Sequence, residues 1–196
     1  MAATYEFYLS QLQVDTEQLT IVIVSGAHPA LVAEIMGIDL TRPEDDPWDV
    51  DGGIDFSAYA LLEVPGGVIA CEHTGYADPS VDTLVRLSRD GRRAAVVRSN
   101  IQAHERFGAA RDGELLFDDD EYVYIEDLDR VPDELRPIFD LAWVDLDSDD
   151  DGDGVGPVPV AMAMAETVTC LEVTAEHLRE LTASTYYRAR SQVYFE

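Results

Sequence analysis

The sequence predicts an α+β protein: an antiparallel sheet of about four to six strands with flanking helices, followed by a helical C-terminal part. Three observations support this fold class. Short β-branched runs alternate with turn residues through most of the chain. Hairpin turns at 65–67 and 111–113 join neighbouring runs. Helical periodicity then prevails near the C-terminus.

The N-terminal region predicts one strand and one helix. Residues 5–13 form a short amphipathic segment, either helix or strand, and the run LTIVIV at 19–24 is typical of a buried strand. Pro29 suits the first turn of a helix, and Gly37 suits its C-terminal cap. The acidic stretch 41–53 contains proline and glycine, so we expect a loop there.

The middle of the chain predicts most of the sheet. Asp78-Pro79 begins a helix that ends at Asp90-Gly91. Apolar runs bounded by turn residues predict strands, which we place at 57–63, 68–72, 94–98, 106–110 and 114–117.

The C-terminal part predicts helices. After an acidic turn at 118–121, a helix is expected from near Pro132, and two more over 161–170 and 174–183. Thr174 is a candidate N-cap, but His177 stands where a capping box has Glu or Gln, so no box is expected. The predicted domain division is an α+β domain at 1–146, an acidic Asp/Gly-rich linker at 147–159 and a helical segment at 160–196.

Charge is the most unusual property of the chain. It has 40 acidic and 13 basic residues, all of the latter arginine, and a formal net charge of −27. Such a surface repels nucleic acid and anionic lipid, so we expect no nucleic-acid or membrane binding. It attracts cationic proteins or metal ions, unless the charge serves solubility alone. The absence of lysine suggests a high-GC bacterial source, with a halophilic one as the alternative.

Targeting signals are missing from the sequence as given. Residues 1–12 lack the basic region and apolar run of a signal peptide, and no apolar stretch approaches the ~20 residues of a membrane span. Cys71 and Cys170, far apart in the sequence, are most simply reduced thiols. We therefore expect a cytoplasmic protein.

Several landmarks lie close together between residues 59 and 117. They are Glu72 with Gly75 shortly after it, the pair Leu87-Ser88 after a helix, Asn100 after a strand, Arg106-Phe107, and the turn Asp112-Gly113-Glu114. With them, this stretch resembles the actinobacterial domain-of-unknown-function 6461 family. The resemblance implies a fold and a source, but no activity, cofactor or site residue.

An aspartate run is the sharpest motif for a metal ion. From Asp149 it reads D-x-D-G-D-G, the first half of a calcium loop with candidate ligands Asp149, Asp151 and Asp153. The twelfth position, which should be a bidentate Glu, is Val160. Pro157 and Pro159 also disfavour an exiting helix. We therefore expect a solvated acidic linker and no cofactor, with a weak calcium site as the alternative.

Other candidate groups lie on the predicted strands. Cys71 and His73 alternate and share one face of a strand, so Cys170 or His104 could complete a zinc site with them; a core thiol beside a surface histidine is the simpler interpretation. Glu72 lies on the opposite face. Arginines cluster from Arg86 to Arg111, either as an anion pocket or paired with the surplus carboxylates.

The functional expectation is a non-catalytic interaction protein, of immunity or antitoxin type, that binds a basic protein partner. No nucleophile elbow, P-loop or dinucleotide motif occurs, so no catalytic residue is assigned. The alternative is an enzyme or small-ligand-binding protein that uses Glu72, His73 or the arginine cluster. The acidic segments 44–51 and 118–129 carry aromatic residues typical of interface anchors. The predicted binding residues are Trp48, Tyr122, Tyr124, Arg92 and Arg93.

Overall fold

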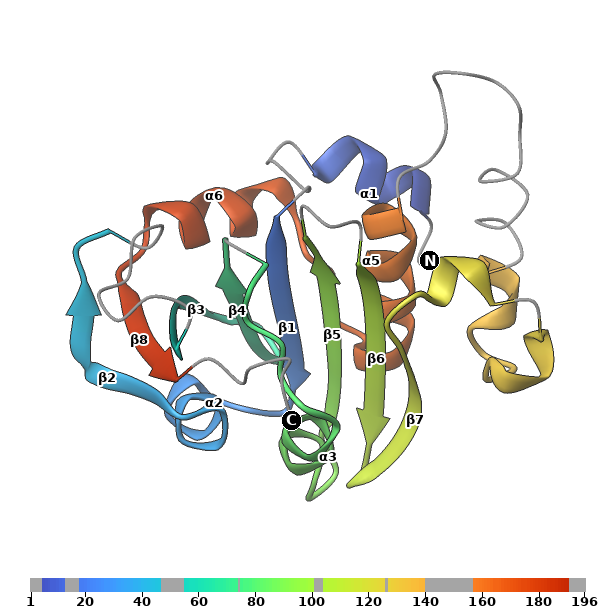
Figure 1. Ribbon diagram of the computed structural model, residues 1–196, viewed down its shortest axis with the longest axis horizontal. Helices are drawn as coiled ribbons and strands as arrows, with labels where there is room; N and C mark the ends of the chain where they lie inside the picture. The colour runs from blue at the N-terminus through green and yellow to red at the C-terminus, as the bar shows by residue number, and fades with distance from the viewer. Residues whose placement is uncertain are drawn as a thin grey trace.

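Eight strands pair into one antiparallel sheet in the computed structural model, which describes residues 5–12, 18–46, 55–73, 75–100, 104–125, 127–139 and 157–190. The strands are β1 (Leu19–Ser25), β2 (Ile38–Glu44), β3 (Phe56–Val64), β4 (Gly67–Glu72), β5 (Arg93–Ser99), β6 (Glu105–Arg111), β7 (Glu114–Asp119) and β8 (Tyr186–Arg190). Their order across the sheet is β2-β8-β3-β4-β1-β5-β6-β7 (Figure 1).

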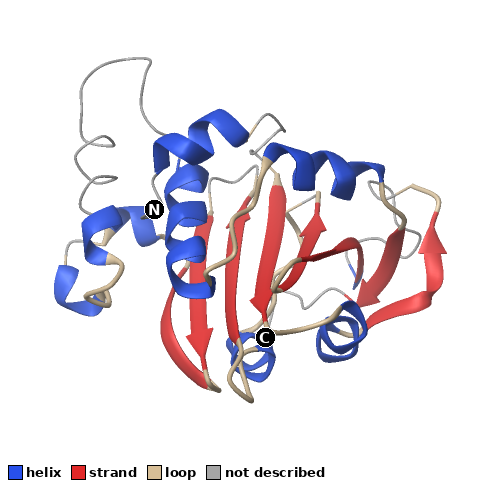
Figure 2. Cartoon of the chain, turned by 180° about the vertical axis from the view of Figure 1, so that it is seen from behind, coloured by secondary structure: helices blue, strands red, loops and turns tan. Residues whose placement is uncertain are grey.

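Helices cover both faces of this sheet, so the fold has three layers (Figures 1 and 2). One face carries α2 (Pro29–Met36) and α3 (Val81–Leu87). The other carries α1 (Tyr5–Gln11), α5 (Pro157–Thr169) and α6 (Ala175–Ala183). Two 3-10 turns, η2 (Tyr122–Tyr124) and η3 (Leu128–Arg130), follow β7. The α+β class is therefore confirmed.

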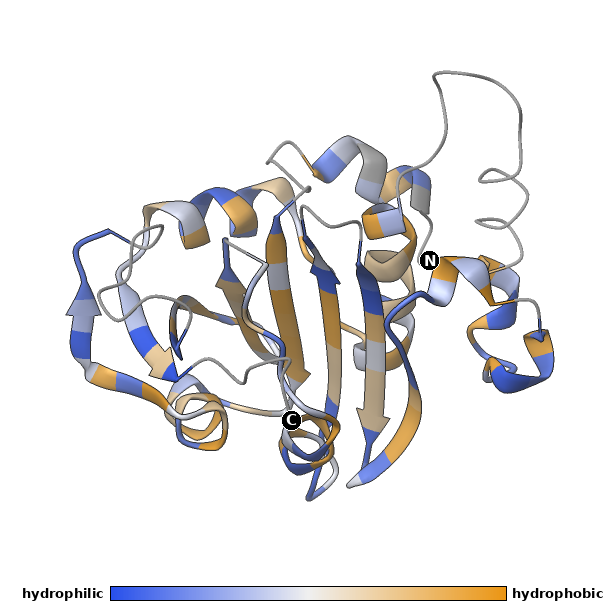
Figure 3. Cartoon of the chain, in the orientation of Figure 1, coloured by the Kyte–Doolittle hydropathy of each residue, from blue (hydrophilic) through white to orange (hydrophobic). Residues whose placement is uncertain are grey.

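The central strand β1 shows why both faces need cover. Ile21 and Ile23 join the core beneath α5, whereas Val22 and Val24 join the core beneath α2 and α3. Side chains alternate along a strand, so a strand buried on both faces is apolar at nearly every position, and Thr20 is the buried exception in β1. Figure 3 shows this as orange over most of the length of β1 and β5.

The predicted number of strands was too low, since the sheet has eight rather than four to six. One additional strand, β2, occupies part of the stretch expected to be an acidic loop. It contains Pro43 and is largely exposed, so it lacks the apolar alternation of a strand. The other, β8, comes from the aromatic C-terminal tail and lies between β2 and β3. Pairing supplied from elsewhere in the fold makes both segments strands.

Local signals placed the helix ends with mixed success. Pro29 begins α2, and Gly37 caps it in the left-handed conformation, as predicted. The expectation of no capping box in α6 was wrong: Thr174 Oγ1 accepts from the His177 amide, and the Thr174 amide donates to His177 Nδ1 over 3.3 Å. The imidazole Nδ1 of His177 thus accepts the hydrogen bond that a Glu or Gln side chain accepts in the usual capping box.

Proline also begins a helix where we expected it to prevent one. Pro157 is the first residue of α5, and Pro159 lies in its first turn, where no backbone donor is needed. The helix expected from Pro132 starts later, with a helical turn at 136–139. Residues 140–156 lie outside the described residues. Within the described ranges, no helix is long and apolar enough to cross a membrane.

Candidate functional site

A row of buried polar side chains crosses the α2/α3 face near one end of the central strands. The strand register aligns Glu72 with Thr20, Thr20 with Arg98, and Arg98 with Arg106. All four residues are at most 3% exposed. Neighbouring strands therefore bring together residues that are far apart in the sequence.

The loop from β4 to α3 lies over this polar row and supplies acceptors to it. Arg98 Nε donates to the Gly75 carbonyl oxygen over 2.8 Å, and Thr20 Oγ1 donates to the Ala77 carbonyl oxygen over 2.6 Å. Gly75 has φ +66°, and a Cβ there would lie 2.4 Å from the Ser99 carbonyl oxygen. Only glycine fits this loop so close to β5.

Arg106 links the row to three carboxylates. Its guanidinium pairs with Asp78, with Asp118 at 2.8 Å and with Asp120 at 3.7 Å. Burial opposes the charge of Arg106, but Asp78 and Asp118 outweigh it and raise the pKa of the guanidinium. Burial also raises the pKa of Asp118, against the attraction of Arg106. The end of β7 is thus fastened to the loop before α3.

An open hollow on the outside of this network is strongly acidic. Its lining consists of His104, Asp118, Asp119, Asp120 and Glu121. We call these residues the acidic hollow. His104 immediately precedes β6, and the four acidic residues run from the end of β7 to the residue before η2. The hollow places carboxylates beside solvent, where they can attract a positive group.

Beside the acidic hollow, the two tyrosines predicted to bind a partner differ in accessibility. Tyr124 is 69% exposed. Tyr122 is 1% exposed, and its hydroxyl donates to the Pro157 carbonyl oxygen. The segment can therefore present Tyr124 to a partner, while Tyr122 holds η2 against α5. Trp48 lies outside the described residues.

The two arginines predicted to bind a partner cap helix ends. Arg92 Nε donates to the Leu87 carbonyl oxygen at the end of α3 over 2.8 Å. Arg93 donates to the Val168 carbonyl oxygen over 3.2 Å and to Cys170 Sγ over 3.0 Å at the end of α5. Cations at helix C-termini satisfy carbonyl groups that lack a helical partner.

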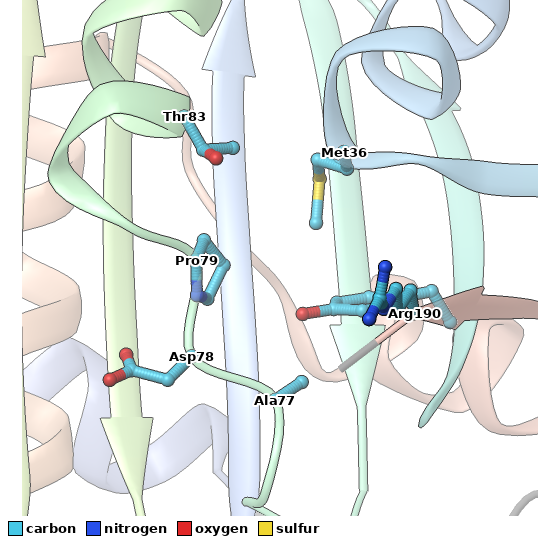
Figure 4. Close-up of a pocket in the computed structure, with 7 residues that line it drawn as sticks. Met36, Ala77, Asp78, Pro79, Thr83 and Arg190 are labelled. Atoms are coloured by element: carbon cyan, nitrogen blue, oxygen red, sulfur yellow. The ribbon is translucent and has the colours of Figure 1, made fainter. Parts of the chain in front are cut away.

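A small pocket opens on the same face as the polar row (Figure 4). It is lined by Met36, Tyr59, Ala77, Asp78, Pro79, Thr83 and Arg190. In Figure 4 the Asp78 carboxylate points away from Met36 and Arg190. Burial raises the pKa of Tyr59 well above its ordinary value, so its hydroxyl stays protonated. The Asp78 carboxylate is instead paired with Arg106.

The thiol and imidazole candidates lie on the other face of β4, as predicted. Cys71 Sγ is 4.0 Å from His73 Nε2, and Glu72 faces away from both. Burial raises the pKa of the Cys71 thiol and lowers that of His73, so both favour their neutral forms. Among the described residues, no group of three or more His, Cys, Asp and Glu side chains can hold a metal ion. The run Asp149, Asp151, Asp153 lies outside those residues.

The family landmarks take structural roles around this network. Glu72, Gly75 and Arg106 belong to the polar row and its covering loop. Ser88 Oγ accepts from the Gly113 amide over 3.0 Å and so joins the end of α3 to the β6–β7 turn. The landmarks therefore describe how the loop and hairpin are held on the sheet.

This architecture defines the chain as an α+β protein whose buried arginine network supports an acidic hollow. It belongs to the family of unknown function DUF6461, whose family model matches residues 55–189. The match includes β3 to β8 and begins after β1 and β2. No curated protein and no solved structure matches the chain.

Proposed function

We propose that this protein is a non-catalytic interaction protein, of immunity or antitoxin type, that binds a cationic protein partner through the acidic hollow and Tyr124. The proposal places it in the cytoplasm, consistent with its two free thiols, and in an actinobacterial source, consistent with an arginine-only set of cations.

The observation that carries this proposal is the excess of negative charge that remains after the arginines have formed ion pairs within the chain. The chain has a net charge of −27, and many arginines are engaged with partners in the same chain. Arg106, Arg111 and Arg188 form ion pairs, and Arg98 donates to a carbonyl oxygen. Asp129 lies 3.5 Å from Arg136, yet its side chain is 93% exposed, so even this ion-paired carboxylate remains in solvent.

The acidic hollow is a specific site at which the negative charge of the protein can attract a partner. Several carboxylates surround it, and an exposed tyrosine follows it in the chain. Aromatic anchors within a charged rim are common in protein interfaces, and opposite charges accelerate association. A basic protein surface is therefore the complementary partner.

Charge reversal provides the test, after partner proteins have been captured from the native host and identified. Asp120→Lys with Glu121→Lys should weaken binding of the captured protein by about tenfold, because like charges then face each other. Glu172→Lys with Glu180→Lys changes the net charge equally, at exposed sites around α6. This control pair should change the dissociation constant by less than about threefold.

Two outcomes oppose the proposal. Equal weakening by both pairs would mean that total charge, rather than the hollow, controls binding. If the protein retains only a small metabolite, with no protein partner, the enzyme or ligand-binding alternative takes its place.

A further inference from the structure

The two edges of the sheet differ in how they are protected. On one edge, β2 contains Pro43, and its pairing with β8 is irregular between Ile38 and Pro43. On the other, β7 has no proline, and in the described part of the chain it is paired with β6 alone. Proline is a common way to prevent a further strand from adding to a sheet. The pairing is irregular at both edges, so the proline of β2 is what distinguishes them.

The sequence around β7 is acidic instead. Asp112, Glu114, Asp118, Asp119 and Asp120 lie in or beside this strand, and Figures 1 and 2 both show it at the margin of the sheet. A second copy of the same edge would bring carboxylates against carboxylates, which disfavours self-pairing. A basic strand would meet opposite charge at the exposed Asp112, Glu114 and Asp120. Asp118 and Asp119 already pair with Arg106 and Arg130.

Apolar contact is also available on this strand. Leu115 is 44% exposed, and its register partner on β6 is Ala110, which belongs to the core beneath α3. The pairing of β7 with β6 has a register shift between Ala109 and Ala110. It divides β7 into two short regularly paired stretches, one near Glu114 and one near Asp118. The acidic hollow includes Asp118 and Asp119 from the stretch nearer to η2.

We propose that β7 is the docking edge for an extended, arginine- or lysine-rich segment of the partner, which adds to the sheet as a ninth strand. This inference rests on the proposed function and specifies how the partner binds. Backbone hydrogen bonds to β7 give affinity, while the carboxylates of β7 and the acidic hollow select a basic sequence. Such a segment places its flanking residues at the hollow and beside Tyr124.

A synthetic nine-residue peptide of alternating arginine and valine is the first probe. N-methylation of every second amide removes the donors from one edge of an extended peptide and leaves its charge unchanged. Methylating the amides of both edges should weaken binding by at least about tenfold, because several backbone hydrogen bonds of about 1 kcal/mol each are lost. At least one of the two single-edge peptides should bind within about threefold of the parent peptide.

Two exposed leucines on opposite edges provide a matched pair of variants. Leu115→Arg on β7 should weaken the unmethylated peptide by about fivefold or more, through repulsion and lost apolar contact. Leu40→Arg on β2, where the leucine is 41% exposed, changes the net charge identically and should have less than about a twofold effect. Amide exchange in β7, not in β2, should slow when the peptide binds.

Three results would overturn strand addition. These are equal binding of the doubly methylated and parent peptides, equal effects of the two leucine variants, and no binding of the parent peptide at low salt. If charge reversal at Asp120 and Glu121 still weakens the captured partner, the proposed function survives without this docking mode. If the chain self-associates through β7 in place of binding the peptide, the docking edge belongs to a second copy and the inference is also wrong.

Discussion

Arg98 donates from Nε to the carbonyl oxygen of Gly75 over 2.8 Å, and this bond ties the loop before α3 to β5. Both partners are held tightly, because Arg98 is 2% exposed and Gly75 has almost no space around its Cα. The loop in turn carries Asp78 to Arg106 and so supports the acidic end of β7.

Replacement of Gly75 by alanine should therefore destabilise the protein by about 3 kcal/mol. The left-handed backbone costs a side chain about 1 kcal/mol or more, and here the new Cβ also meets the Ser99 carbonyl oxygen. Gly37→Ala is the control, since Gly37 has a similar φ but open space around it, and should cost about 1 kcal/mol. Urea unfolding measures both values, and equal costs would contradict the close approach.

Loss of Arg106 should destabilise the fold more than loss of an exposed arginine. Arg106→Met leaves Asp78 and Asp118 without their cation and should lower the free energy of unfolding by about 3 kcal/mol. Arg130→Ala removes a half-exposed partner of Asp119 and should cost less than about 1 kcal/mol. Denaturant titration of both variants provides the comparison. Similar stabilities would mean that the buried network contributes little.

Glu105 should make the protein less stable as the pH rises. Burial raises its pKa to about 7, although Ser99 and Arg98 oppose the shift. Because the folded state then binds a proton more tightly than the unfolded state, stability from Glu105 is complete below pH ~4.5 and is lost as the pH rises to ~7. After a discount for partial exposure, the loss is about 1–2 kcal/mol.

The Glu105→Gln variant isolates this contribution from the other carboxylates. Relative to the original protein, it should gain about 1–2 kcal/mol of stability between pH 5 and pH 8. Thermal or urea unfolding at both values measures the difference. A constant difference between the two proteins at all pH values would show that Glu105 titrates normally.

Salt should stabilise the protein. The net charge of −27 repels itself in the folded state, and ions screen this repulsion beyond ~10 Å at 0.1 M. We expect the melting temperature to rise by several degrees between low and high sodium chloride. Sodium sulfate is a poor substitute, because it also strengthens burial of apolar surface. A constant or falling melting temperature in sodium chloride would oppose this prediction.

The stability that the capping box of α6 provides should depend on which residues occupy positions 174 and 177. Thr174→Ala removes the acceptor for the His177 amide and should cost about 1 kcal/mol. His177→Glu retains an acceptor for the Thr174 amide and should leave stability within about 0.5 kcal/mol. Thermal unfolding of the two variants tests this. A large loss with His177→Glu would show that the imidazole has another role.

Local sequence signals predicted the parts of the fold that depend on neighbouring residues. The run of β1, the hairpins at Gly66 and Gly113, and the first turn and cap of α2 all combine residues a few positions apart. In contrast, β2 and β8 become strands because they pair with each other across most of the chain. Nothing in the composition of either segment specifies that pairing.

The candidate site was harder to predict for the same reason. Arg106 was visible as a landmark and as part of an arginine cluster, and Asp118 as part of an acidic segment. Their connection to Asp78 depends on how a loop crosses the sheet. The ion pairs of Arg106 with Asp78 and Asp118 could have been predicted from the sequence only if the strand register had been known.

The position of β8 affects how the protein is made. The strand lies between β2 and β3, yet both of those strands leave the ribosome long before it does. Until β8 emerges, β2 has no neighbour in the sheet, and the adjoining edge of β3 is open. The β2 and β8 strands must therefore join the sheet after synthesis has passed Arg190, and the nascent chain exposes the unpaired edge of β3 to chaperones until then.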